Sequence, residues 1–485
     1  MIGRERPKPG MFSTSNPDHC APRFAAFRRA LPYAAFLVLA ALIYGKSAGY
    51  GFILLWDDAE YVAANELIRS FTFTNLAGMF TTPILGNIAP LQLLSYCLDH
   101  LVWGLDPAGY HITNVALHGL NACLLYVVIS RIAGERRIAF LATLLFVVHP
   151  LNVENVAWVA ERKTLLAAVF SLLSLNRYMT YRERGGRWAY AISLLCAVCG
   201  ILSKATAVVI PLLFAAYEYY LQRERRSFMP IAPFFFLSAG GAVLALWAQR
   251  AGGAFTEGPY TFELLATTIY PTMLTIYWKY LGLLIAPFGL SGYYDTSLHH
   301  GADLAVLLSA AGWIVLFFLV FKRGTLQVRF WFLWFCICFL PTSNLVPLPV
   351  YYADRYLYLP AVGLFVLVSM ALVRVSGWLE LQQGTRTAVA ALAAAGAFLV
   401  LFYGMLAFQR LDVWRNDLSL WEDTAAKSPR QYKARLNLGA AYENAGRLVE
   451  AEREYLQAIA IYPSPYAVEN LKVVQEKLRI VNSGR

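Results

Sequence analysis

Two adjacent carboxylates stand where the chain first leaves a long apolar segment. Residues 31–55 carry a single charge, and the stretch W-D-D-A-E-Y-V at 56–62 follows them with Asp57 and Asp58 side by side. A carboxylate at the edge of a membrane can take the proton of an attacking hydroxyl group and so act as a general base. A solvated loop acid is the ordinary alternative, but the adjacency of the pair and its aromatic neighbours favour a function. The sequence leaves open which of the two would be the base.

Five basic residues complement these acids. They stand near the predicted ends of apolar segments, on the same side of the membrane as the two acids, where basic side chains are costly and commonly functional. Together they would bind a phosphate or pyrophosphate carried by a lipid and stabilise its charge as it leaves. For each one alone an ordinary ion pair is an equal alternative, such as Glu161–Arg162 or Asp354–Arg355. The set is Arg162, Lys163, Lys204, Lys279 and Arg355.

Several polar residues recur at helical spacing near the ends of apolar segments. A lone histidine in this position is more often a structural residue with satisfied hydrogen bonds than a ligand. We nevertheless predict a group of substrate contacts, without a metal ligand set among them. No cofactor is implied by the sequence, and a divalent metal is compatible with it but not indicated. The predicted contacts are His111, Asn114, His149, Glu154 and Asp354.

The composition predicts an all-α polytopic membrane protein that would hold these residues. Of 485 residues, 58% are hydrophobic and 15% are charged, whereas soluble domains carry about 25% charged residues. The net charge of +11 does not indicate a nucleic-acid partner, since most basic residues stand in short loops between apolar runs. Because about 20 apolar residues cross a bilayer, we expect about eleven transmembrane helices. They lie near 31–50, 111–131, 137–156, 163–180, 188–203, 205–221, 230–249, 303–321, 329–347, 356–374 and 387–408.

One further apolar segment, 263–287, decides the topology of the chain after it. It carries Lys279 and an internal Pro271, and a full crossing would place the basic residues at 322–329 outside, against the positive-inside rule. We therefore expect this segment to re-enter the membrane or to lie on its surface. The N-terminus is then inside, and the C-terminus and the first loop, 51–110, are outside.

The chain divides into three parts. Residues 1–30 are polar, basic and rich in proline, and predict a disordered cytoplasmic tail before the membrane domain of residues 31–408. Residues 410–480 are polar and helical in pattern. From Tyr432 onward they match a tetratricopeptide repeat, with L-G at 438–439 and Pro463 at the expected offsets. A short array of this kind would bind an acceptor protein or a partner subunit.

These motifs resemble the bacterial relatives of the transmembrane and tetratricopeptide-repeat O-mannosyltransferases, within the GT-C class of glycosyltransferases. The resemblance covers about residues 50–470, and its motifs keep their order and spacing. The matching stretches are WDDAEYVAANELI, LLSYCLDHLVWGLDPAGYHITNVALHGLNACLL, HPLNVENVAWVAERK, LSKATAVVIP and YYADRYLYLPAVGL, followed by the repeat.

The resemblance implies a GT-C-type bundle in which an acid of the first external loop, Asp57 or Asp58, is the catalytic base. It implies a polyprenyl-phosphate sugar as donor, inversion at the sugar, and an acceptor hydroxyl, with Ser or Thr of a protein favoured. The active site and the repeat would share the periplasmic side of a bacterial inner membrane. A glycolipid or polysaccharide acceptor is the alternative within the enzymes. A flippase for lipid-linked sugars, or a scaffold that uses the repeat, is the alternative outside them.

Overall fold

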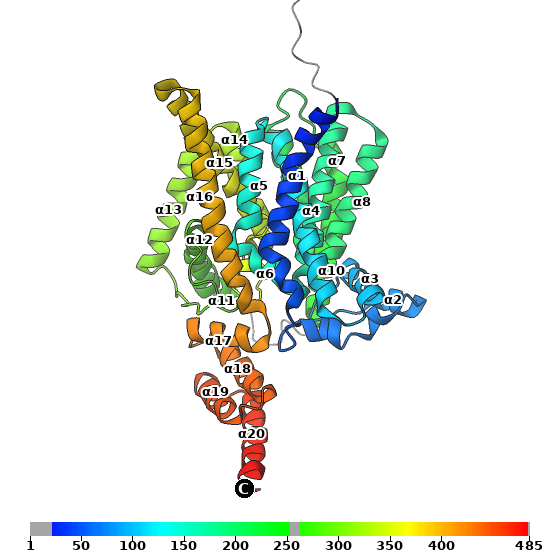
Figure 1. Cartoon of the computed structure of the whole chain (residues 1–485), viewed down its shortest axis with the longest axis vertical. Coiled ribbons are helices and arrows are strands. Elements are labelled where there is room, and N and C mark those ends of the chain that lie inside the picture. The colour runs from blue at the N-terminus through cyan, green and yellow to red at the C-terminus, as the bar shows by residue number, and fades with distance from the viewer. Residues whose placement is uncertain (1–21, 253–261, 484–485) are drawn as a thin grey trace, which may run out of the picture.

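The chain folds as a bundle of helices with a smaller helical extension at its C-terminal end (Figure 1). The computed structural model describes residues 22–252 and 262–483, and within these ranges there is no β-strand, only an isolated bridge between Ile84 and Asn87. The bundle helices are α1 (Pro22–Tyr44), α4 (Pro107–Ala133), α5 (Arg136–Val148), α6 (Val153–Ala157), α7 (Arg162–Arg184), α8 (Arg187–Ser203), α9 (Ile210–Tyr220), α10 (Ala232–Ala251), α11 (Phe262–Leu264), α12 (Tyr270–Ile285), α13 (Leu304–Arg323), α14 (Leu326–Phe339), α15 (Pro360–Gln383) and α16 (Thr385–Leu411).

Each of the eleven predicted spans is helical, but they differ in length and apolarity. Among the described residues, six helical segments are long and apolar enough to cross a membrane, and α5 with α6 forms a seventh that bends by 55°. The bend follows from Pro150, which lacks a backbone N–H and cannot continue the helix. The shorter apolar segments are 187–203, 205–220 and 326–342. The polytopic all-α class is confirmed, and the count of eleven spans stays a prediction.

The first helix begins within the predicted N-terminal tail. Helix α1 begins at Pro22, so residues 22–30 are helical, while residues 1–21 lie outside the described residues. Arginine is a good helix former, and Arg28 and Arg29 are compatible with a helix that begins before its apolar part. This helical start differs from the disorder expected for residues 22–30, and the domain boundary at residue 30 stays a prediction.

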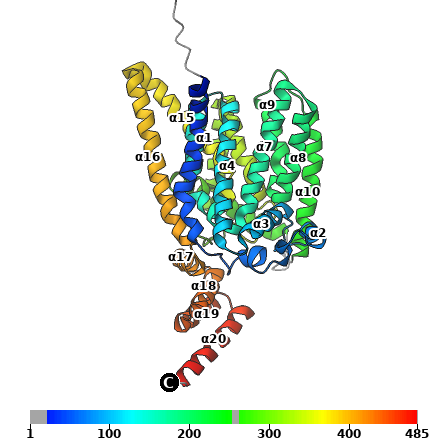
Figure 2. The same cartoon turned by 45° about the vertical axis from the view of Figure 1, so that its right-hand side comes forward.

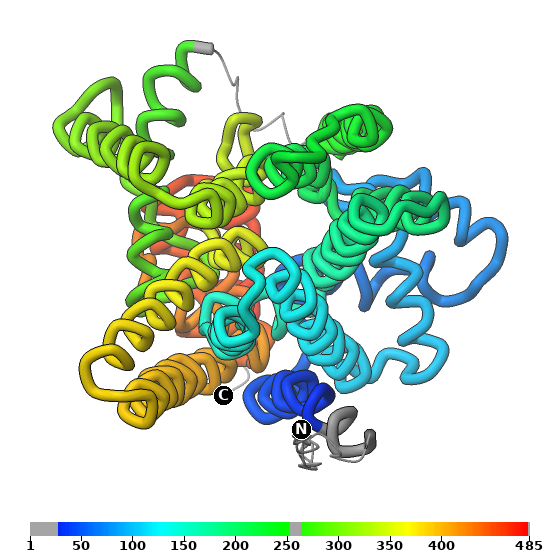
Figure 3. The backbone as a smooth tube through the Cα atoms, turned by 90° about the horizontal axis from the view of Figure 1, so that it is seen from above, coloured from blue at the N-terminus to red at the C-terminus, as the bar shows by residue number. Residues whose placement is uncertain are grey.

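The two ends of the bundle carry different parts of the chain (Figures 1 and 2). The start of α1 lies at one end, together with the turns that join α4 to α5, α7 to α8 and α15 to α16. The first loop lies at the other end with its two helices, α2 (Phe73–Thr81) and α3 (Pro90–Trp103). The C-terminal helices extend from this same end. Viewed from above, most of residues 22–251 form one side of the bundle and most of residues 262–411 the other (Figure 3).

The segment 263–287 is helical through α11, a single π-type turn and α12. Figure 1 places α12 beside α13, in the half of the bundle nearer the C-terminal helices. Its inner face is buried, and Trp278 packs on Trp313 with ring centroids 5.0 Å apart. Whether this segment crosses, re-enters or lies on the membrane stays a prediction.

The C-terminal extension consists of α17 (Asp417–Lys427), α18 (Tyr432–Asn444), α19 (Leu448–Ile461) and α20 (Pro465–Ser483). Helices α18 and α19 pack through the residues that the repeat pattern singles out. A Cβ atom at Gly439 would come within 2.6 Å of the Tyr455 ring, so only glycine allows this close approach. The two helices have the lengths and the turn that the pattern from Tyr432 predicts, and the assignment as a tetratricopeptide repeat stays a prediction.

Candidate functional site: a cavity lined by cations and carboxylates

A cavity of about 530 Å³ lies where the bundle meets the first loop and the C-terminal helices. Its polar wall holds Asp57, Glu161, Lys163, Lys204 and Arg355. Most of the apolar residues that line it come from α10 and from the segment 346–350. A concave site that combines an apolar wall with a few converging charged groups suits an amphiphilic ligand.

The two adjacent aspartates have different surroundings. Asp57 lines the cavity, and its Oδ2 lies 3.7 Å from Nζ of Lys163. Asp58 points away from the cavity and is 1% exposed. Its two oxygens accept hydrogen bonds from the backbone N–H groups of Ile53 and Ala160, each at 2.8 Å. Asp58 thus joins the first loop to the turn before α7, while Asp57 is available to a ligand.

Burial raises the pKa of Asp57 above its ordinary value, and the charges of Lys163 and Arg355 act in the opposite direction. Burial likewise raises the pKa of Asp58, to about 7, against the two backbone N–H groups that favour its charged form. A carboxylate with a raised pKa is a stronger base, so the environment of Asp57 suits proton abstraction.

Three of the five predicted cations meet at the cavity: Lys163, Lys204 and Arg355. They surround the buried carboxylate of Glu161, whose oxygens lie 3.9 Å from Lys163, 3.0 Å from Lys204 and 3.8 Å from Arg355. Burial would raise the pKa of Glu161, but the three cations together lower it to about 2. Glu161 therefore stays ionised and holds the three cations in place around the cavity.

Arg162 does not belong to this group. Its guanidinium is fully buried, with Asp99 at 2.5 Å, Oδ1 of Asn114 at 2.8 Å and the carbonyl of Tyr110 at 2.8 Å. The predicted local pair with Glu161 is not formed, because successive residues at the start of α7 point in different directions. Arg162 does not line the cavity, and its predicted part in phosphate binding stays a prediction that this position does not support.

Lys279 is also absent from the cavity wall. It lies on the exposed face of α12, while the opposite face of that helix is buried. The prediction that Lys279 contributes to phosphate binding is therefore not supported by its position.

The predicted substrate contacts are mostly structural. His111 lies 3.3 Å from the carbonyl of Gly51, Asn114 holds Arg162, and Nε2 of His149 lies 3.2 Å from the carbonyl of Leu284. All three side chains are buried and none of them lines the cavity. Their types and spacing therefore reflect packing between helices.

Glu154 and Asp354 lie directly behind the cations. Glu154 accepts hydrogen bonds from the backbone N–H of Arg355 at 2.9 Å and from its Nη1 at 2.5 Å. Asp354 accepts from the hydroxyl of Tyr294 at 2.5 Å, and burial together with Glu154 raises its pKa. The predicted local pair of Asp354 with Arg355 is replaced by the pair of Arg355 with Glu154. Glu154 thus orients Arg355 of the cavity, while Asp354 holds Tyr294, and neither acid lines the cavity itself.

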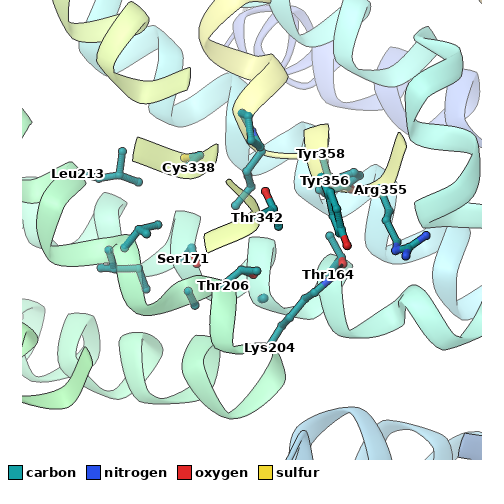
Figure 4. A pocket seen from close by; sticks show the side chains of 16 residues that line it. Thr164, Ser171, Lys204, Thr206, Leu213, Cys338, Thr342, Arg355, Tyr356 and Tyr358 are labelled. Carbon is teal, nitrogen blue, oxygen red and sulfur yellow. Dashed lines mark hydrogen bonds between the residues drawn. The ribbon is translucent and has the colours of Figure 1, made fainter. Parts of the chain in front are cut away.

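A smaller cavity of about 50 Å³ continues inward from Lys204 and Arg355 (Figure 4). It runs between α7, α9 and the loops around α14 and α15, and it ends among apolar side chains such as Leu213 and Cys338. Figure 4 shows Lys204 extending toward Thr164, whose hydroxyl accepts a hydrogen bond from Nζ of the lysine at 2.7 Å. This bond and the pair with Glu161 fix the position of the ammonium group.

The C-terminal helices hold the loop that carries Asp57. Asp417 of α17 accepts hydrogen bonds from the backbone N–H groups of Leu54 and Leu55 at 3.2 and 2.9 Å. Asn437 of α18 donates to the carbonyl of Leu55 at 3.3 Å. The loop is therefore bound to the extension within two residues of the cavity carboxylate.

Trp56 fills the space between these parts. Its ring packs on Trp158 with centroids 4.2 Å apart, on Tyr293 at 5.0 Å and on Trp421 of α17 at 5.3 Å. The sequence pattern does not predict this cluster, the meeting of Glu161 with three cations, or the position of Lys433 of α18, which also lines the cavity. A high density of Trp and Tyr just outside the predicted spans was the signal available for the cluster.

The described ranges, 22–252 and 262–483, contain no group of three or more His, Cys, Asp or Glu side chains placed to hold a metal ion. The acids and histidines of the site are instead engaged with cations or backbone groups.

The fold and the site define a polytopic helical membrane protein with a cation-lined cavity at one end of its bundle. No protein-family model matches the chain. The chain is similar to protein O-mannosyl-transferase TMTC4 of Mus musculus, with 26% identity over 90% of the chain and 67% of that protein. It is 24% identical to protein O-mannosyl-transferase F38B6.6 of Caenorhabditis elegans, over 84% of the chain and 60% of that protein. It is also 24% identical to protein O-mannosyl-transferase TMTC1 of Homo sapiens, over 87% of the chain and 54% of that protein.

The curated homologues of this chain are thus protein O-mannosyl-transferases, and the resemblance to that family is confirmed. The chain spans 54% to 67% of the length of these three relatives.

Two solved structures align at 13% identity. One is ArnT from Cupriavidus metallidurans bound to undecaprenyl phosphate, with a TM-score of 0.42 over 92% of this chain and 77% of that one. The other is the Archaeoglobus fulgidus oligosaccharyltransferase tethered with an acceptor peptide, with a TM-score of 0.43 over 91% of this chain and 60% of that one.

Proposed function

We propose that this protein is a membrane glycosyltransferase that transfers a mannose-like hexose from a polyprenyl-phosphate donor to an acceptor hydroxyl, with Ser or Thr of a protein as the acceptor. One observation carries the proposal: Asp57, the more exposed of the two carboxylates that line the cavity, faces the same space as Lys163, Lys204 and Arg355. The relatives' names, protein O-mannosyl-transferases, supply the sugar and the class of acceptor.

The reaction follows from the charges around the cavity. Asp57 takes the proton of the acceptor hydroxyl, and the oxygen attacks C1 of the sugar from the side opposite the phosphate. The bond between C1 and the phosphate oxygen breaks, and the configuration at C1 inverts. The leaving phosphate gains one negative charge, which Lys163, Lys204 and Arg355 stabilise without having to move, because Glu161 and Glu154 already hold them.

The apolar wall of the cavity suits the lipid part of the donor. Leu246 of α10 and Val346 line the cavity and are also 41% and 46% exposed at the surface of the bundle. A polyprenyl chain in the bilayer would therefore reach the cations from this side. We assign α10 and Val346 to the donor entrance.

The arrangement of the loops supports the proposed orientation. The turns joining α4 to α5 and α7 to α8 carry Arg131, Arg136, Arg182 and Arg187 at the end opposite the cavity. Positive loops stay on the cytoplasmic side. The cavity and the C-terminal helices then lie on the outer side, which is the periplasmic side if the membrane is a bacterial inner membrane.

The test is a transfer assay with the full chain in detergent, using radiolabelled polyprenyl-phosphate mannose and, separately, glucose. Asp57→Asn should lower turnover by about 10²–10⁴-fold, the usual contribution of a general base, and leave folding unchanged. Glu60→Gln is the matched control, since Glu60 is an exposed acid of the same loop. Asp58→Asn should instead lower the yield of folded protein, because an amide has one acceptor oxygen for the N–H groups of Ile53 and Ala160.

Label that moves into protein only when Asp57 is intact supports the proposal as stated. If the label moves into a glycolipid or polysaccharide and this transfer still depends on Asp57, the proposed mechanism holds but the acceptor is not a protein. Transfer that persists in Asp57→Asn contradicts the assignment of the base. Absence of transfer from both donors contradicts the proposed enzyme and favours a flippase or a scaffold.

A further inference from the structure

A second cavity, of about 300 Å³, lies between the loops of the bundle and the C-terminal helices. We call it the tyrosine cleft. Its walls come from three segments, 293–298, 349–352 and 431–433. Five of the residues that line it are tyrosines, namely Tyr293, Tyr294, Tyr351, Tyr352 and Tyr432.

The tyrosine cleft adjoins the cavity that contains Asp57. Four residues line both, namely Tyr293, Pro349, Val350 and Lys433. Helix α10, which forms the proposed donor entrance, contributes to the first cavity only. The cleft therefore joins the cavity of Asp57 beside the C-terminal helices, through residues that the proposed donor entrance does not include.

The walls of the tyrosine cleft are held together by bonds between the bundle loops and the extension. Ser428 donates to the carbonyl of Tyr293 at 2.7 Å, and Gln431 donates to the carbonyl of Tyr294 at 3.2 Å. The rings of Tyr294 and Tyr352 pack with centroids 4.0 Å apart. A cleft that is fixed in this way binds its ligand without the entropic cost of ordering its own loops.

We infer that the tyrosine cleft binds an extended segment of the acceptor polypeptide and leads its Ser or Thr hydroxyl to Asp57. The inference rests on the proposed function. An in-line reaction needs the acceptor on the side of the sugar opposite the phosphate, and the cleft joins the cavity of Asp57 through residues that do not belong to α10, so the acceptor and the donor can enter by separate routes. Tyrosine is enriched where proteins bind polypeptides, because its ring provides apolar contact area and its hydroxyl finds a polar partner.

The test compares variants that alter the tyrosine cleft with matched variants beside it. Thr296→Trp fills the cleft, and Ser297→Trp places the same ring on an exposed neighbour outside it. Lys433→Glu reverses a charge that lines both cavities, and Lys472→Glu makes the same change on the exposed face of α20. The probe is a pool of synthetic peptides that contain Ser and Thr, with radiolabelled polyprenyl-phosphate mannose as donor.

We expect Thr296→Trp and Lys433→Glu each to raise KM for the peptides about tenfold, the effect of losing one or two aromatic or charged contacts. In Thr296→Trp, the KM for the donor should stay at the wild-type value. In the two control variants, the KM for the peptides and the KM for the donor should both stay at the wild-type value. Unchanged peptide KM in both cleft variants would overturn the inference. So would transfer to a glycolipid or polysaccharide that the peptides do not compete with.

A second measurement separates this inference from the proposed function. A photo-crosslinking amino acid at position 296 of the full chain should capture a peptide from the pool in the absence of any donor, and the same group at position 297 should not. Capture without any transfer would support the tyrosine cleft and contradict the enzyme. Transfer without capture at 296 would support the enzyme and overturn the cleft.

Discussion

Replacing Arg162 by methionine should destabilise the bundle without a specific effect on donor binding. The change keeps most of the apolar volume of the side chain and removes its charge. It leaves the carboxylate of Asp99, which is 10% exposed, without its cationic partner at 2.5 Å. It also removes the donors to Asn114 and to the carbonyl of Tyr110.

The magnitude follows from these lost contacts. Removing one partner of a buried ion pair costs about 3–5 kcal/mol, because the other charge stays buried without compensation. A loss of about 4 kcal/mol lowers the ratio of folded to unfolded protein by roughly a thousandfold. Replacing both partners by apolar residues, as in Arg162→Met with Asp99→Leu, should recover most of this loss.

The assay is thermal unfolding of the purified protein in detergent, together with turnover per folded molecule. Lys163→Met is the matched comparison, since Lys163 follows Arg162 in α7 but lines the cavity. We expect a lower Tm for Arg162→Met with near-normal KM for the donor, and the reverse pattern for Lys163→Met. A normal Tm with a raised donor KM in Arg162→Met would refute the structural role and restore Arg162 to the phosphate site.

Three further results are expected. Asp57 must be deprotonated to act as the base, and burial raises its pKa. The loss of kcat/KM at acidic pH should therefore begin at a pH above the ordinary range for aspartate. Lys163→Met should move this acidic loss to higher pH, since the charge of the lysine lowers the pKa of Asp57. Asp417→Asn, which removes one acceptor for the N–H groups of residues 54–55, should lower kcat about tenfold and leave the helical content measured by circular dichroism unchanged. Lys279→Ala should leave transfer and Tm unchanged, because Lys279 is exposed on α12.

The sequence predicted the helices and the ends of the bundle well because hydropathy and loop charge act locally. It also singled out Asp57, Lys163, Lys204 and Arg355, which the structure brings to one cavity, since charged residues beside apolar segments are rare enough to be informative. It could not assign Arg162 to Asp99, which lies 63 positions earlier in the chain and on another helix. Such pairs depend on how helices pack, and spacing along one helix does not report that.

The neighbouring residues Asp57 and Asp58 show the same limit of sequence-based prediction. Both residues have the same type and the same hydropathic surroundings in the sequence. Their roles separate only when the N–H group of Ala160, about a hundred positions away, is brought to Asp58. The sequence also could not predict that Lys433 lines the cavity, because this depends on where the C-terminal helices pack against the bundle.

The attachment of α17 to the first loop couples the C-terminal extension mechanically to Asp57, the proposed catalytic carboxylate. Asp412, just after α16, holds Lys46 at 2.9 Å and Tyr50 at 2.7 Å, and Asp417 holds the backbone two residues before Asp57. A partner that pulled on α18–α20 would therefore transmit force to the loop before the bundle itself moved. Mechanical load on the extension, such as tension from a bound polypeptide, would then slow or stop turnover by displacing one carboxylate.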